Sequence, residues 1–267
     1  MVTLFSLVAL GFFLGMRHAT DADHVIAIST IVSRQRKLGS AALIGALWGV
    51  GHTMTVAVVG GAIILFGVVI PPHVGLAMEF AVGVMLVLLG VMSLSGITQR
   101  IRDAVAPYKG HSYHAHTHAH GDYAHTHPHG HGIGGHGHRP EQTPQAWLDR
   151  HLGKLSAYQL LRPLIVGIVH GLAGSAAMAL LVLNAIRDPW WGVVYLLVYG
   201  LGTVAGMMLI TAAIAAPFAY SASKLPRINT FMRFASGVLS LGFGLFLMFY
   251  IGYVDGLFSD HPKWSPN

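Results

Sequence analysis

His18-Ala-Thr-Asp21-Ala-Asp23-His24 places two histidines and two aspartates within seven residues. Residues 2–16 before this motif are almost wholly apolar, and residues 25–32 after it are nearly so. Ionisable groups inside a membrane cost about 2.5–3.5 kcal/mol each on insertion scales, and they usually mark an ion pathway. Imidazole and carboxylate together suit a borderline divalent cation. We therefore predict that this motif forms an intramembrane site for a transition-metal ion.

The composition is typical of a membrane protein. Of the 267 residues, 54% are hydrophobic and only 10% are charged, whereas soluble domains are usually about 25% charged. Hydropathy predicts an all-α polytopic protein with six transmembrane helices, each long enough to cross a hydrocarbon core of about 30 Å. The predicted spans are residues 3–32, 39–70, 74–98, 160–186, 190–217 and 230–254.

The basic residues predict the orientation of these spans. Lys and Arg concentrate between the first and second spans, the third and fourth, and the fifth and sixth. The positive-inside rule places these loops in the cytoplasm and both termini outside the cytoplasmic (inner) membrane. Because the formal charge of +6 lies mostly in loops, it indicates a lipid bilayer rather than a nucleic acid as partner.

Some kinds of chemistry are excluded by residues that the chain lacks. It has no cysteine, so thiolate ligands and disulfides are ruled out. It has no phosphate-binding loop of the G-x-x-x-x-G-K-[ST] type, so this chain does not itself hydrolyse ATP to drive transport. We expect a transporter rather than an enzyme, with no cofactor besides the transported ion.

The two halves of the chain resemble each other. Gly15-x-x-His18 recurs as Gly167-x-x-His170, and Met78-Glu-Phe-Ala81 recurs as Met232-Arg-Phe-Ala235. Since each half holds three predicted spans, an odd number, the halves must be inverted relative to each other. Inverted repeats are typical of secondary transporters, whose site lies near the midplane. We predict a first three-helix repeat over 1–105, a loop over 106–157, a second repeat over 158–254 and an extracytoplasmic tail over 255–267.

The motif offers a set of candidate metal ligands. On a continuous helix, with about 100° per residue, His18, Asp21 and His24 share one face. Asp23 then points to the other side. It joins the ligands if the helix unwinds there. Otherwise it pairs with Arg17 or orients a neighbouring imidazole, as carboxylates near metal sites often do.

Two further intramembrane histidines are weaker candidates. His52 lies near the middle of the second predicted span, at a depth similar to that of the motif. It is either a ligand or a hydrogen-bonding residue between helices. His170 occupies the repeat position of His18, but no carboxylate follows it. It is a ligand, a gating residue or a packing residue.

These motifs resemble those of a known family. Arg17-His-Ala-Thr-Asp-Ala-Asp-His24 is similar to the H-x-x-x-x-D-H signature of the nickel/cobalt transporter family (NiCoT), and Gly51-His-Thr53 resembles its second motif. The resemblance covers residues 1–100 well and the second half only by architecture. It implies that His18, Asp21, Asp23, His24 and His52 handle the metal. The second half lacks the acidic signature of typical members, and six spans depart from their usual eight.

A histidine-rich segment separates the two predicted repeats. Residues 107–145 are nearly free of aliphatic side chains, which predicts disorder. Closely spaced neutral imidazoles bind transition metals, so we predict a cytoplasmic metal buffer that also suits handover to a metallochaperone. Its eleven histidines are His111, His114, His116, His118, His120, His125, His127, His129, His131, His136 and His138.

The sequence thus predicts a secondary transporter for Ni²⁺ and Co²⁺, with uptake as the expected direction. An exporter of the same or other divalent transition metals is the first alternative, because a long cytoplasmic histidine loop also occurs in related exporters. An intramembrane haem protein with two axial histidines is the second alternative. It explains the histidines but leaves Asp21 and Asp23 without a role.

Overall fold

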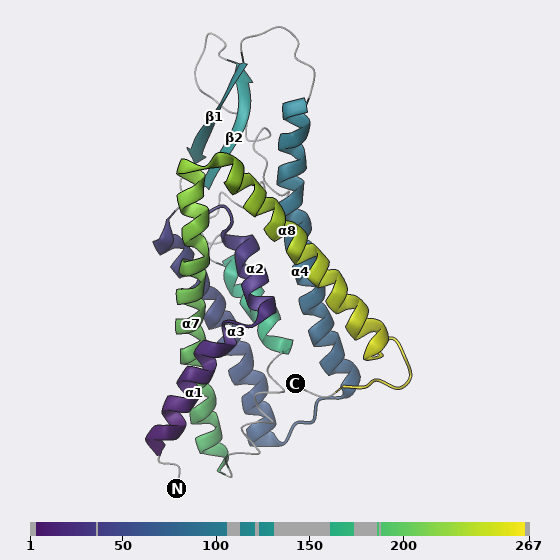
Figure 1. The fold of residues 1–267 in the computed structure, drawn as a ribbon. Coiled ribbons are helices and arrows are strands. Elements are labelled where there is room, and N and C mark those ends of the chain that lie inside the picture. The colour runs from purple at the N-terminus through teal and green to yellow at the C-terminus, as the bar shows by residue number, and fades with distance from the viewer. Residues whose placement is uncertain are drawn as a thin grey trace.

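The computed structural model describes residues 4–35, 37–105, 113–120, 123–130, 161–173, 186 and 188–264. These residues form an elongated helical bundle with a two-stranded ribbon at one end (Figure 1). The helices are α1 (Leu4–His18), α2 (Ala22–Val32), α3 (Leu38–Phe66), α4 (Pro72–Val105), a helix Leu161–Ala173, α7 (Pro189–Lys224) and α8 (Pro226–Phe249), which continues into a π-helical turn, η2 (Tyr250–Val254).

Among the described residues, four helical segments are long and apolar enough to cross a membrane. They are Leu38–Phe66, Pro72–Ser95, Pro189–Ala222 and Pro226–Val254. They correspond to four of the six predicted spans. The fourth predicted span, 160–186, is described as a shorter apolar helix, Leu161–Ala173, and most of its remainder lies outside the described residues.

The first predicted span, 3–32, is not one helix. It is divided into α1 and α2, and the break lies near the middle of the bundle's length (Figure 1). After His18 the backbone closes in tight turns, with Thr20 N donating to Arg17 O at 2.8 Å and Asp21 N to His18 O at 3.1 Å. Asp21 then takes an extended conformation and precedes α2 as its N-cap residue, but its side chain makes no capping hydrogen bond and contacts His18 instead. The sequence left open whether this span is one helix or is broken at the motif, and the structure has the break.

Small residues allow the helices to pack closely around this break. α7 packs against α3 and α1, and α4 packs against α8. The backbone of α7 at Gly202 lies against the carbonyl of Phe12 in α1. Gly83 of α4 lies against Gly244 of α8. Such approaches of backbone to backbone are typical of membrane helix pairs.

The helix Leu161–Ala173 packs against α3. Gly51 lies against the carbonyl of Leu164, and Gly167 lies against Trp48. Thr55 Oγ1 donates to Ile168 O at 3.1 Å. These contacts fix the level of Leu161–Ala173 along α3, and they bring His170 to the level of His52.

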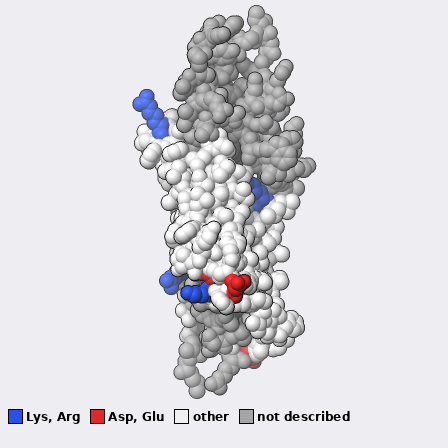
Figure 2. Space-filling view, turned by 90° about the vertical axis from the view of Figure 1, so that its right-hand side faces the viewer, with Lys and Arg blue, Asp and Glu red and all other residues white. Residues whose placement is uncertain are grey.

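The outer surface is apolar. Large side chains such as Phe13, Val58 and Phe231 are about two-thirds exposed. Lys, Arg, Asp and Glu are few on the described surface seen in Figure 2. An apolar exterior on helices of this length is what a lipid environment requires, so the chain is an integral membrane protein.

Two paired strands are described within the histidine-rich segment. β1 (Tyr113–His120) and β2 (Tyr123–Gly130) pair antiparallel, with His116 opposite His127 and Thr117 opposite Thr126. Histidine alternates there with alanine, threonine and tyrosine, and a period of two residues is the strand pattern. Threonine and tyrosine also favour strands. The remaining residues of 107–145 lie outside the described ones.

We predict that Gly202→Ala destabilises the bundle. A Cβ at this position would collide with the carbonyl oxygen of Phe12, and overpacking of this kind costs about 1–3 kcal/mol. The free energy of unfolding of the purified protein in detergent should fall by that amount. Gly242→Ala is the matched control, because no heavy atom lies within 4 Å of its added Cβ. Equal stability of the two variants would contradict the described packing of α7 on α1.

Candidate metal-binding site

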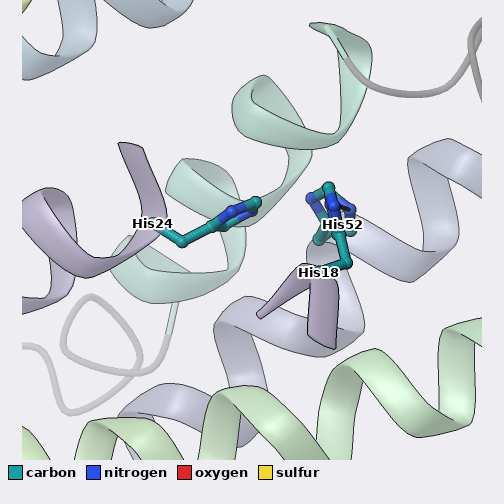
Figure 3. Close-up of side chains that lie close together, drawn as sticks. All are labelled: His18, His24 and His52. Carbon is teal, nitrogen blue, oxygen red and sulfur yellow. Dashed lines mark hydrogen bonds between the residues drawn. The ribbon is translucent and has the colours of Figure 1, made fainter. Parts of the chain in front are cut away.

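Four histidines from four helices converge beside the break between α1 and α2. His18 ends α1, His24 lies in the first turn of α2, His52 lies near the middle of α3, and His170 lies in Leu161–Ala173. The ring centroid of His24 is 4.7 Å from that of His18 and 4.2 Å from that of His170. Figure 3 shows the side chain of His24 extending toward the rings of His18 and His52.

His18, His24 and His52 form the first ligand group. One ring nitrogen from each lies within 4.8 Å of the others. His18 Nε2 is 3.1 Å from His52 Nε2, and Asp21 Oδ2 is 2.8 Å from His18 Nδ1. Because the carboxylate favours the proton on Nδ1, the lone pair of His18 lies on Nε2 and is directed at the group. This is the carboxylate–histidine arrangement that orients metal ligands.

Asp23, His24 and His170 form the second ligand group, again with one ligand atom from each within 4.8 Å of the others. Asp23 Oδ2 is 2.9 Å from His170 Nε2, and Asp23 Oδ1 is 3.3 Å from His24 Nδ1. Asp23 is thus held between two imidazoles. His24 belongs to both ligand groups.

The imidazoles at the centre are buried and incompletely hydrogen bonded. His24, His52 and His170 are each 2% exposed or less. Within the described part of the chain, His52 Nδ1, His170 Nδ1 and Trp48 Nε1 have no hydrogen-bond partner. Buried polar atoms are normally paired with protein, water or an ion. This set of nitrogen and oxygen atoms therefore fits a bound, coordinated species at the centre of the cluster.

The donor set favours a transition-metal ion. Two carboxylates and four imidazoles suit Ni²⁺, Co²⁺ or Zn²⁺, whereas Mg²⁺ and Ca²⁺ prefer oxygen alone. With neutral imidazoles, Asp21 and Asp23 supply two negative charges, which match a divalent cation. The C-terminal end of α1 adds the negative end of a helix dipole.

The roles of the two aspartates differ from the helical-wheel prediction. The wheel put Asp21 among the ligands and Asp23 on the opposite side. In the structure Asp21 is half exposed and contacts His18 Nδ1, while Asp23 contacts both His24 and His170. The reason is the break after His18, because it rotates α2 relative to α1 and brings Asp23 inward. The sequence predicts this inward placement of Asp23 only for a helix that unwinds at the motif.

Two aromatic residues that the sequence analysis did not single out line the cluster. The ring of Trp48 lies 5.6 Å from His170 and 6.0 Å from His24. The ring of Tyr199 lies 5.7 Å from His18. Trp48 precedes His52 by four residues, so the two share a helix face. This four-residue spacing from His52 was the sequence signal that could have identified Trp48.

The positions of the histidines disfavour the haem alternative. A porphyrin must lie between its two axial nitrogens, and His18 Nε2 and His52 Nε2 are only 3.1 Å apart. The rings of His24 and His170 are also in direct contact, with centroids 4.2 Å apart. Neither pair leaves room for a macrocycle.

We predict that Asp21→Asn, introduced together with His170→Ala so that only the first ligand group is complete, lowers the affinity for Co²⁺ by about 10–100-fold relative to His170→Ala alone, the usual effect of losing a carboxylate that orients a histidine ligand. Binding should be measured by titration of the full-length chain in which the eleven loop histidines are replaced by asparagine, here called the loop-substituted chain. Asp260→Asn, which removes an exposed carboxylate in the C-terminal tail, is the control. Unchanged affinity in Asp21→Asn would show that Asp21 does not orient His18.

Comparison with known proteins gives two similarities. The chain is 35% identical over 257 residues to the urease accessory protein UreH of Bacillus sp. (strain TB-90), covering 96% of this chain and 96% of that protein. It is 24% identical over 239 residues to the chloroplast protein FOR GROWTH AND FERTILITY 2 of Arabidopsis thaliana, covering 88% of this chain and 54% of that protein. This chain therefore spans about half the length of the plant protein.

No family model matches the chain, and no solved structure gives a significant match. The first similarity nevertheless extends over nearly the whole of both proteins. At 35% identity over that length, the chain belongs to the family of the urease accessory protein UreH.

Proposed function

We propose that this chain is a secondary transporter that carries Ni²⁺, and also Co²⁺, across the cytoplasmic membrane in the direction of uptake. The observation that carries the proposal is the convergence of His18, Asp23, His24, His52 and His170 within an apolar bundle. Groups this costly to bury are retained in membranes mainly where an ion passes. We place both termini outside and the histidine-rich segment in the cytoplasm.

The choice of nickel rests on the relative and on the motif. The relative is named as a urease accessory protein, and urease is a nickel enzyme. A membrane protein of that family, with a cluster of histidines and aspartates, is suited to supplying this metal. The resemblance of residues 17–24 to the nickel/cobalt transporter signature supports the same ion, and imidazole ligands suit both Ni²⁺ and Co²⁺.

The packing of the helices supports a mechanism based on two inverted repeats. α1 packs against α7, the second helix of the second half, while α3 packs against Leu161–Ala173, the first helix of that half. α4 and α8, each third in its half, pack against each other. A two-fold axis in the membrane plane would produce these pairings. Broken helices at the repeat interface are typical of such carriers.

The histidine-rich segment serves as a cytoplasmic buffer in this proposal. The register of the ribbon makes partners of His114 and His129, of His116 and His127, and of His118 and His125. Residues directly opposite each other lie on the same face of an antiparallel pair. Closely spaced imidazoles in paired segments would suit holding an ion before its handover to a metallochaperone.

We predict that His18→Ala combined with His24→Ala abolishes accumulation of ⁶³Ni²⁺ by cells that express the chain, because both ligand groups lose members. His73→Ala is the matched control, since this exposed histidine lies in the first turn of α4 and belongs to neither ligand group. Accumulation that survives in the double variant would refute the proposed site. Export, the alternative direction, would appear as reduced nickel tolerance of a deletion strain, whereas loss of import should increase tolerance.

We also predict that uptake of ⁶³Ni²⁺ falls as the external pH is lowered. Ligand imidazoles must be neutral, so protons compete with the metal and the loss occurs on the acidic side. Initial rates of ⁶³Ni²⁺ uptake between pH 5 and pH 8 provide the measurement. A rate that rises toward low pH would contradict the prediction.

A further inference from the structure

One histidine is shared between two complete ligand groups. His24 joins His18 and His52 in the first group, and it joins Asp23 and His170 in the second. Its ring contacts the ring of His18 at 4.7 Å and that of His170 at 4.2 Å. Each group by itself has three ligand atoms close enough to hold one cation.

The chemistry of imidazole makes these two groups mutually exclusive. A neutral imidazole carries a proton on one ring nitrogen and a lone pair on the other, so it offers a single ligand atom. His24 can therefore bind an ion in one group at a time. Two divalent ions side by side would also repel each other strongly in a medium of low dielectric constant.

The two groups draw on different parts of the chain. The first group takes all its ligands from α1, α2 and α3. The second group adds His170, which lies beyond the histidine-rich segment, and so it links the two halves. Asp21 contacts His18, in the first group, and Asp23 contacts His170, in the second. Each group thus has its own carboxylate.

We propose that the transported ion passes between the two ligand groups with His24 as the retained ligand, while His18 and His52 are exchanged for Asp23 and His170. This inference rests on the proposed transport function. Its physical basis is that a divalent ion need not lose all of its ligands at once within an apolar bundle, where a bare ion is very costly. His170 then acts mainly in the transfer of the ion and contributes less to the affinity with which the ion is bound.

The proposal makes a specific prediction for binding, with Co²⁺ as the probe and the loop-substituted chain as the protein. His18→Ala leaves the second group intact, and His170→Ala leaves the first intact, so each variant should still bind one Co²⁺ with affinity reduced less than about tenfold. His24→Ala breaks both groups and should lose more than about 100-fold, beyond the usual effect of changing an orienting residue. The visible absorption spectra of His18→Ala and His170→Ala should differ, because the remaining groups have different ligands.

Uptake should respond differently from binding. His170→Ala should reduce ⁶³Ni²⁺ uptake by the otherwise native chain at least about tenfold while Co²⁺ binding persists, since transfer and not capture is lost. His170→Gln keeps an N–H donor for Asp23 but no imidazole, and it should show the same loss. His73→Ala should change neither uptake nor binding. Thermal unfolding of each variant checks that it is folded.

Several results would overturn the handover. In binding, these are two Co²⁺ ions bound per loop-substituted chain, or loss of binding in His170→Ala. In uptake, they are full uptake by His170→Ala, or rescue of uptake by His170→Gln. Rescue by His170→Gln would show that His170 acts only as a hydrogen-bond donor. In each of these cases uptake by the native chain would still support the transporter. If the native chain moves no nickel at all, the transporter and the handover fail together.

Discussion

The arrangement of this protein depends on the cost of placing imidazole and carboxylate groups among apolar helices. Groups of this kind are retained inside a bilayer only when they are paired or hold an ion. Asp21 pairs with His18, Asp23 pairs with His170 and His24, and the ring nitrogens of His18 and His52 face each other. Every other feature of the site follows from the need to bring these groups together.

The break between α1 and α2 is what allows this pairing. A continuous helix would have carried Asp23 away from His24 and His170, with a buried carboxylate left unpaired. Instead, the tight turns after His18 and the N-cap at Asp21 redirect the chain. Close glycine contacts of α1 with α7, and of α3 with Leu161–Ala173, then hold the four histidines at one level.

The family assignment and the geometry support one interpretation from independent directions. A relative named as a urease accessory protein covers nearly the full chain, and the clustered nitrogen and oxygen atoms suit a borderline divalent metal ion. The presence of two ligand groups around His24 also offers a physical route for movement. A shared ligand lets the ion exchange its other ligands in steps. A single site in which all ligands are fixed would not allow this.

The sequence by itself determined the membrane class and indicated the candidate ligands. Long apolar runs indicated spanning helices, and ionisable residues within them indicated His18, Asp21, Asp23, His24, His52 and His170, because composition and burial cost can be judged without coordinates. The tertiary structure alone decided the roles of the two aspartates, the partnership of His170 with Asp23 and the presence of Trp48 beside the cluster. The physical reason is that a helical wheel assumes an unbroken helix, while contacts between distant segments arise only from packing. The pairing of residues 113–120 with residues 123–130 is likewise a contact between segments, which composition does not reveal.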